Sequence, residues 1–243
     1  MYTYQRILGA ATASLAVTLA TAGCSMLGGS STPSATASSS PSPTAVSAGV
    51  LADKSVADLK AAETVRLKGQ LNSAGQKLDV DLRLVAGKGC TGTIAMSGKG
   101  SFVMTLLGKK LWIKPDKAFW AGVGAHGSKL AEVEGRYIAT TVSSKAFGSF
   151  ASFCDAKTMA GEFGSSAGLT RGAVSTVDGQ SVVAVQGGSQ GVAYITDDAA
   201  PHLVRLVKPG TDGGRIDFLD YNKPVVITAP HATLTVPGSK FGF

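Results

Sequence analysis

A short glycine- and serine-rich string has the spacing of a hydrolase nucleophile. Gly164, Ser166 and Gly168 follow the G-x-S-x-G pattern, in which a tight turn from a strand into a helix exposes the serine hydroxyl. Here the order is reversed, because a helix is predicted to end near Phe163 and a strand to begin near Leu169. We therefore interpret the string as a connector. Loss of an esterase activity in a Ser166→Ala variant would contradict this interpretation.

The aspartates and histidines of the chain form no pattern that is typical of a catalytic or metal-binding site. Asp79 and Asp81 fall on one face of a predicted strand among basic residues, which is typical of a solvated surface rather than an acid–base pair. His126, His202 and His231 are far apart in the sequence, and the last two are expected in surface loops. Neither an HExxH zinc motif nor a GxxxxGK[ST] phosphate loop occurs. The sequence predicts no enzyme, no cofactor and no metal site.

Cys24 follows a segment that has the features of an export signal in the expected order. A weakly basic stretch, Met1–Arg6, precedes a mostly apolar run, Ile7–Ala20. That run is too short to span a bilayer, which needs roughly 20 residues. The two small residues before the cysteine resemble a lipobox, where a lipid is attached and the signal, residues 1–23, is removed. The alternatives are an ordinary signal with an unrelated cysteine, or a short buried helix.

Lipid attachment at Cys24 predicts a protein anchored to the cell membrane on its extracytoplasmic face, with the membrane itself as a partner. Residues 24–49 contain Ser, Thr, Ala, Gly and Pro with no charge, so they cannot bury enough apolar area to fold. We expect a mobile tether there, although a glycosylated stalk uses the same residue types. Residues 50–243 are long enough for one domain with a sizeable core.

The charge of the chain is positive and widely spread. It has 23 basic and 16 acidic residues, and only Arg6 of these lies in the signal, so the mature protein keeps a net charge of +6 (22 against 16). Such a surplus can favour anionic lipid headgroups or wall polymers. Export and the scattered basic residues argue against nucleic acid as a partner.

Cys90 and Cys154 remain once Cys24 is modified. An even pair of cysteines in an oxidising compartment predicts a disulfide, which would close a loop of about 65 residues and contribute about 4 kcal/mol in the chain-entropy model. Two buried free thiols are the alternative.

Periodicity predicts one helix followed by ten strands. Val56, Leu59 and Ala62 recur at helical spacing between Asp53 and Glu63, with Asp53 or Ser55 as the N-cap. Period-two alternation and tight turns then predict strands at 65–71, 78–84, 91–96, 102–107, 110–114, 170–176, 181–186, 192–196, 203–207 and 215–221. A single antiparallel sheet of that size has to curl, and its apolar face has to be covered.

The predicted cover is the segment 116–161, which lacks clean alternation and holds most of the aromatic residues. We expect a helix over Ser149–Phe163 and a shorter one around Leu130 and Val133. Cys154 on the longer helix would then join the cover to Cys90 on the sheet. The aromatic residues either fill the core or line a cavity between helices and sheet.

Most of residues 50–230, preceded by the lipobox and the low-complexity tether, resembles a known family in its first helix, its antiparallel strands and its central helical insertion. The segments Ala193–Asp198, Pro201–Arg205 and Ile216–Pro230, most sharply Phe218–Pro230, look like the LppX/LprG group of actinobacterial lipoproteins, which is similar in fold to the LolA/LolB lipoprotein carriers. The resemblance implies an α+β fold in which a single large, strongly curved antiparallel β-sheet, a half-barrel, is covered by a few helices. It also implies an apolar cavity that holds acyl chains or glycolipids.

Our leading hypothesis is a carrier or scaffold that binds a lipid, a glycolipid or a lipid-linked envelope precursor in that cavity. The alternative is a structural or interaction lipoprotein with a filled core, which docks an envelope protein partner and carries no ligand. The residues expected to line the cavity are Leu67, Leu82, Leu84, Ile94, Met96, Met104, Leu106, Trp120, Phe147, Phe150 and Phe153.

Overall fold

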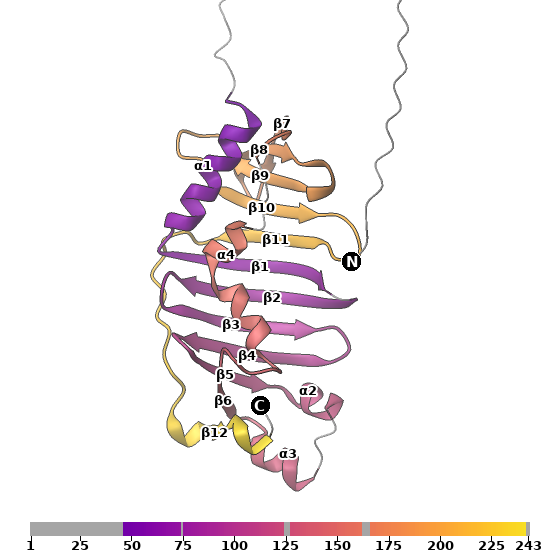
Figure 1. Cartoon of the computed structure of the whole chain (residues 1–243), viewed down its shortest axis with the longest axis vertical. Coiled ribbons are helices and arrows are strands. Elements are labelled where there is room, and N and C mark those ends of the chain that lie inside the picture. Colours follow the sequence, from indigo (N-terminus) through magenta and orange to yellow (C-terminus); the bar gives the residue numbers. More distant parts are fainter. Residues whose placement is uncertain (1–45, 74, 124–126, 162–165, 242–243) are drawn as a thin grey trace, which may run out of the picture. The chain divides into compact units, whose positions relative to one another are not determined.

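A single curved sheet dominates the folded unit (Figure 1). The computed structural model describes residues 46–73, 75–123, 127–161 and 166–241, and these contain twelve strands in one sheet. The strands are β1 (Thr64–Ser73), β2 (Gln76–Val85), β3 (Gly89–Met96), β4 (Gly100–Leu107), β5 (Lys110–Pro115), β6 (Tyr137–Thr141), β7 (Thr170–Val177), β8 (Gln180–Gln186), β9 (Val192–Thr196), β10 (Leu203–Lys208), β11 (Gly214–Leu219) and β12 (Thr235–Pro237). Their order across the sheet is β12-β6-β5-β4-β3-β2-β1-β11-β10-β9-β8-β7.

Alternation along the strands decides which face of the sheet is dry. In β2, Leu78, Val80, Leu82 and Leu84 are all buried, while the residues between them point to the outer face. Strands β1 and β2 form the predicted antiparallel hairpin, in which Leu67 lies opposite Leu82. The α+β class and the single curved sheet expected from the sequence are therefore confirmed.

The sheet has two strands that the periodicity did not predict. Strand β6 lies inside the aromatic-rich segment that we expected to be a helical cover, and β12 has three residues. These two strands pair in parallel, with Val236 opposite Ile138, whereas we predicted antiparallel pairs throughout. A long connection, residues 220–234, carries the chain past the other strand ends before β12 begins (Figure 1). Strands this short leave too few alternating positions to be recognised.

Helix α1 (Ala48–Ala61) begins earlier than predicted. Its N-cap is Ser47, whose hydroxyl accepts the Val50 N–H at 3.4 Å, so the assignment of Asp53 or Ser55 as the cap was wrong. Ser55 is instead buried in the middle of the helix, and its hydroxyl donates to the Ala52 carbonyl oxygen. Leu51, on the buried face, extends the apolar stripe by one turn toward the N-terminus.

The expected long helix over Ser149–Phe163 is split into the 3₁₀ helix η1 (Gly148–Cys154) and helix α4 (Ala156–Gly161). Asp155 separates them, because its carboxylate accepts the Lys157 N–H and the Thr158 hydroxyl and thereby starts a new helix. The shorter predicted helix around Leu130 and Val133 is α3 (Ser128–Val133).

Helices cover one face of the sheet. Helix α1 lies across β7–β10, and η1 and α4 lie across the central strands (Figure 1). Helices α2 (Lys117–Gly122) and α3 lie toward the other end, and the short 3₁₀ turns are η2 (Gly188–Gln190), η3 (Ala232–Leu234) and η4 (Gly238–Phe241). In the part of the chain that the structure describes, no helix combines the length and the apolar character needed to cross a bilayer.

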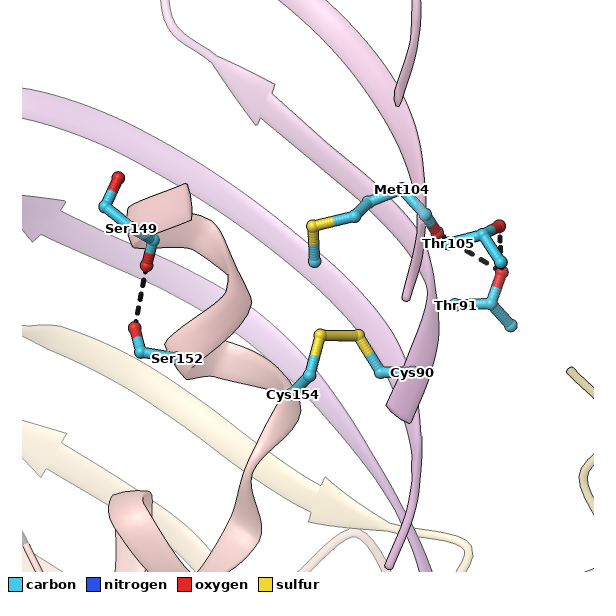
Figure 2. Close-up of a disulfide and its surroundings, with 7 residues drawn as sticks. All are labelled: Cys90, Thr91, Met104, Thr105, Ser149, Ser152 and Cys154. Atoms are coloured by element: carbon cyan, nitrogen blue, oxygen red, sulfur yellow. Dashed lines mark hydrogen bonds between the residues drawn. A yellow bond between two sulfur atoms is a disulfide. The ribbon is translucent and has the colours of Figure 1, made fainter. Parts of the chain in front are cut away.

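A disulfide joins the cover to the sheet. Cys90 of β3 is bonded to Cys154 at the end of η1, as predicted (Figure 2). The side chain of Met104 lies on the same side of the sheet as the disulfide. The Thr91 and Thr105 hydroxyls lie on the opposite side, 3.2 Å apart. The close-up thus separates the covered apolar face of the sheet from its polar outer face.

Candidate functional site

The residues predicted to line a cavity belong to one continuous core. Most are buried, and Met96, Phe150 and Phe153 are half-buried against the others. The buried ones are Leu67, Leu82, Leu84, Ile94, Met104, Leu106, Trp120 and Phe147. The structure therefore brings the sheet side and the helix side together, and whether they ever line a ligand cavity stays a prediction.

Phe102 is the centre of the aromatic packing. Its ring, 1% exposed, lies edge-on to Phe119 at 6.1 Å, to Phe147 at 6.0 Å and to Phe150 at 5.1 Å between ring centroids. We did not predict this residue among the lining set. It lies two positions before Met104 in β4, and residues two apart in a strand share one face of the sheet. These rings fill the space between β4 and the helical segment.

A pocket of about 320 Å³ opens where α1 ends and α4 begins, and we call it the end pocket. The start of β1, the end of β2 and the end of β4 form its other walls. Its buried lining includes four large apolar side chains: Leu59, Val65, Leu84 and Leu106. Two of these, Leu84 and Leu106, belong to the predicted lining set. Leu59 and Val65 were missed because they come from the predicted first helix and the start of the first strand.

The mouth of the end pocket carries charged side chains. Lys60, Lys88 and Lys157 are exposed there together with Glu63 and Asp155. The Thr158 hydroxyl and the Lys157 backbone N–H hold the pKa of Asp155 below its usual value by hydrogen bonding to the carboxylate, and burial opposes them only in part. The Asp155 carboxylate thus already accepts hydrogen bonds from the first turn of α4.

A second, smaller pocket lies between α1 and the sheet, and we call it the α1 pocket. Its volume is about 120 Å³. Ala52, Ser55 and Val56 of α1 form one wall, and Ala193 and Leu206 belong to the opposite one. Leu169, Val185, Gly187, Gly191, Ile195 and Lys208 complete it. The lining is mainly apolar, with Ser55 and Lys208 as its polar side chains, and none of it belongs to the predicted set.

A cluster of polar side chains lies around Tyr221, near Asp58 of α1. Tyr221 donates its hydroxyl proton to the Leu203 carbonyl oxygen at 2.9 Å, and burial raises the pKa of this phenol. His202 packs on the Tyr221 ring at 5.2 Å, and its ring nitrogens lie 3.4 Å from the Thr196 hydroxyl and 3.2 Å from the Gln180 side chain. His202 directly precedes β10, but it is half-buried and held by packing and hydrogen bonds, whereas a surface loop was expected.

Comparison with solved structures identifies the fold. No protein-family model matches the chain, and no curated protein matches it. Among solved structures, LprF from Mycobacterium bovis is similar over 75% of this chain and 96% of its own, with 16% identity and a TM-score of 0.52. The protein has an LppX/LprG-like fold. The lipoprotein LppX from Mycobacterium tuberculosis is also similar, over 74% of this chain and 98% of its own, with 12% identity and a TM-score of 0.48.

Within this LppX/LprG-like fold, the G-x-S-x-G string connects a helix to a strand. Gly164 and Ser165 lie outside the described residues, whereas the Ser166 hydroxyl donates to Asp53 at 3.3 Å. Helix α4 precedes the string and β7 follows it, which is the predicted order and the reverse of a nucleophile elbow.

The remaining candidates for chemistry lie apart from one another. The Asp81 carboxylate accepts two hydrogen bonds from Arg66 on the outer face, as a surface residue would. His231 caps the turn at Thr233, and His126 and Cys24 lie outside the described residues. Over the described ranges, no group of three or more His, Cys, Asp or Glu side chains could hold a metal ion.

Proposed function

We propose that the protein is a cell-envelope lipoprotein, anchored through Cys24 on the extracytoplasmic face of the membrane, which binds a hydrophobic ligand between α1 and the sheet. The ligand class is a lipid, a glycolipid or a lipid-linked precursor, and the role is binding without catalysis. The α1 pocket carries the proposal, because it is an apolar hollow between a covering helix and the sheet. Each CH₂ group moved from water into such a place contributes about 0.8 kcal/mol.

The packing of α1 explains how a longer chain would be admitted. Drug-sized ligand pockets usually measure 300 Å³ or more, so a pocket of about 120 Å³ takes only part of an acyl chain while α1 stays in place. Helix α1 buries Ala48, Leu51, Ser55 and Leu59, and its other side chains are half-buried or exposed. An outward shift of this helix would enlarge the pocket, and the ligand would replace the helix contacts that are lost.

The proposed anchor keeps the site near the bilayer. Residues 24–45 lie outside the described residues, and their composition is that of a flexible linker. A random-coil segment of this length has an r.m.s. span of about 26 Å, from roughly 5.5 Å times the square root of the residue number. A ligand taken from the membrane surface would lie within that distance of the domain.

The test is ligand recovery and uptake by the full-length protein. Protein purified from its own membranes should release lipid into organic solvent, show bound lipid by native mass spectrometry, and take up a fluorescent fatty acid. An Ala193→Phe variant fills the α1 pocket and should take up less, whereas Ala95→Phe, on the outer face of β3, should behave like the parent. Absence of both bound lipid and uptake would overturn the proposal.

One observation favours the alternative role of a docking lipoprotein without ligand. The rings around Phe102 pack directly against the sheet, so this half of the covered face is filled. A domain of this kind would present its outer surface to an envelope partner. Protein that is free of lipid and that crosslinks in its own membranes to one specific envelope protein would support this role over the carrier.

A further inference from the structure

The end pocket combines an apolar floor with an opening to solvent. Leu59, Val65, Leu84 and Leu106 are each at most 7% exposed, yet all four border a hollow of about 320 Å³. This volume is at the lower end of the range for small-molecule sites. An apolar floor of this kind gains free energy when an alkyl chain displaces water from it, at about 25 cal/mol per Å².

The rim of this pocket is cationic. Lys60 lies in the last turn of α1, Lys88 in the turn between β2 and β3, and Lys157 in the first turn of α4. Among the described residues, none of these three lysines forms an ion pair with a carboxylate. The rim also holds the carboxylates of Glu63 and Asp155, so three ammonium groups against two carboxylates leave a surplus of one positive charge (3 − 2).

The backbone holds this rim in a fixed arrangement. The Ala86 N–H donates to the Glu63 carbonyl oxygen at 2.8 Å, which fastens the β2–β3 turn to the start of β1. The Gly108 N–H donates to the Lys88 carbonyl oxygen at 2.9 Å, which fastens that turn to the next one. Cys154, in the pocket wall, is tied to β3 by the disulfide (Figure 2). A preformed site of this kind loses less entropy when a ligand binds.

From these features we infer that the end pocket is a separate binding site for an anionic amphiphile. The alkyl chain lies on the floor formed by Leu59, Val65, Leu84 and Leu106, and a phosphate or carboxylate headgroup lies among the three lysines. Neither part suffices alone, since lysines exposed to water gain little from a free anion and a neutral headgroup gains nothing from the positive surplus of the rim. The site is distinct from the α1 pocket, so it does not depend on the proposed function.

The experiment compares probes that share one tail, using the full-length protein. Titration calorimetry with dodecyl phosphate, below its micelle concentration, should give binding about tenfold tighter than with the neutral monolaurin. The preference should shrink as salt is added, because exposed charges are screened. Inorganic phosphate alone should bind too weakly to measure.

Substitutions assign the preference to the rim. The double variant Lys88→Gln/Lys157→Gln should bind dodecyl phosphate about tenfold more weakly and monolaurin as before. The matched control is Lys77→Gln/Lys99→Gln, which removes two exposed lysines at the opposite end of the β2 and β3 strands. This control should leave both affinities unchanged.

Three outcomes would overturn the inference. Equal affinity for the anionic and the neutral probe would remove the role of the lysines. Binding of inorganic phosphate as tight as that of dodecyl phosphate would remove the role of the floor. If the lysine variant lost binding to phosphatidylglycerol vesicles but bound dodecyl phosphate like the parent, the lysines would serve membrane contact instead. Fatty-acid uptake that still depends on Ala193 would leave the proposed function standing in each case.

Discussion

At the scale of single residues, the best-defined electrostatic group lies on the outer face around Asp217. This carboxylate of β11 accepts hydrogen bonds from Arg205, its neighbour in β10, and from Arg215 at 2.7 Å. Burial alone would raise the pKa of Asp217, but the two guanidinium groups outweigh it and lower the pKa. The ionised form is therefore the one that the fold stabilises.

Replacing this carboxylate should destabilise the protein. Asp217→Asn leaves the Arg205 guanidinium, whose side chain is 15% exposed, with Asp178 alone, and we expect a loss of about 2 kcal/mol at pH 7. Urea unfolding of parent and variant measures the difference. Asp197→Asn, which removes the partner of Arg171 at a more exposed pair, should cost less than about 1 kcal/mol.

The same group predicts a pH dependence. A carboxyl group whose pKa is lower in the folded state contributes stability above its unfolded pKa, about 3.9, and loses it as the pH falls through the folded value. The difference in stability between the parent and Asp217→Asn should therefore shrink below about pH 4. A difference that stayed constant from pH 7 to pH 2 would contradict the assignment.

Phe102 makes a residue-scale prediction about the core. Phe102→Ala removes a ring that contacts three other aromatic rings, and we expect a loss of about 3–5 kcal/mol by denaturant unfolding. Val226→Ala, at a side chain that is 85% exposed, should change the free energy of unfolding by less than about 0.5 kcal/mol. A small effect at Phe102 would mean that the aromatic segment does not pack against β4 in solution.

At the scale of secondary-structure elements, the disulfide fastens the end of η1 to strand β3 of the sheet. Opening it by the double substitution Cys90→Ser/Cys154→Ser should remove about 4 kcal/mol in the chain-entropy model and lower Tm by about 10 °C. Thermal unfolding with and without dithiothreitol measures this. The reductant should lower the Tm of the parent and leave the Tm of the double variant unchanged.

The elements also show where periodicity stops being informative. Long strands with a wet and a dry face, such as β2, reveal themselves by alternation alone. Strand β12 buries a single residue, Val236, and it becomes a strand because Ile138 of β6 lies beside it. The split between η1 and α4 at Asp155 likewise follows from two local hydrogen bonds rather than from apolar spacing.

At the scale of the whole molecule, both pockets depend on segments that are distant in the sequence. The floor of the end pocket takes Leu59 from a helix, Leu84 from β2 and Leu106 from β4, and its rim takes Lys157 from another helix. Period-two alternation places Leu84 and Leu106 on the dry face, but it does not tell which dry-face residues meet a helix and which meet a hollow.

The predicted anchor is tested on the whole protein. Cys24→Ala should abolish incorporation of a labelled fatty acid and release a folded domain into the soluble fraction, because the predicted apolar run is too short to hold it in a bilayer. Membrane fractionation of the expressing cells measures this, with the parent chain as the lipid-labelled control. A variant that is still labelled would show that the lipid is attached elsewhere.

By itself the sequence determined the α+β class, most of the strands, the faces of those strands and the pairing of Cys90 with Cys154. Alternation and cysteine count are properties of the chain, so they needed no knowledge of neighbours. Tertiary structure alone decided that the rings around Phe102 fill one part of the covered face and that the hollows lie under α1 and at its C-terminal end. The reason is that close packing depends on the shapes of side chains from separate segments. These side chains come into contact only when the sheet has curved and the helices are packed on it.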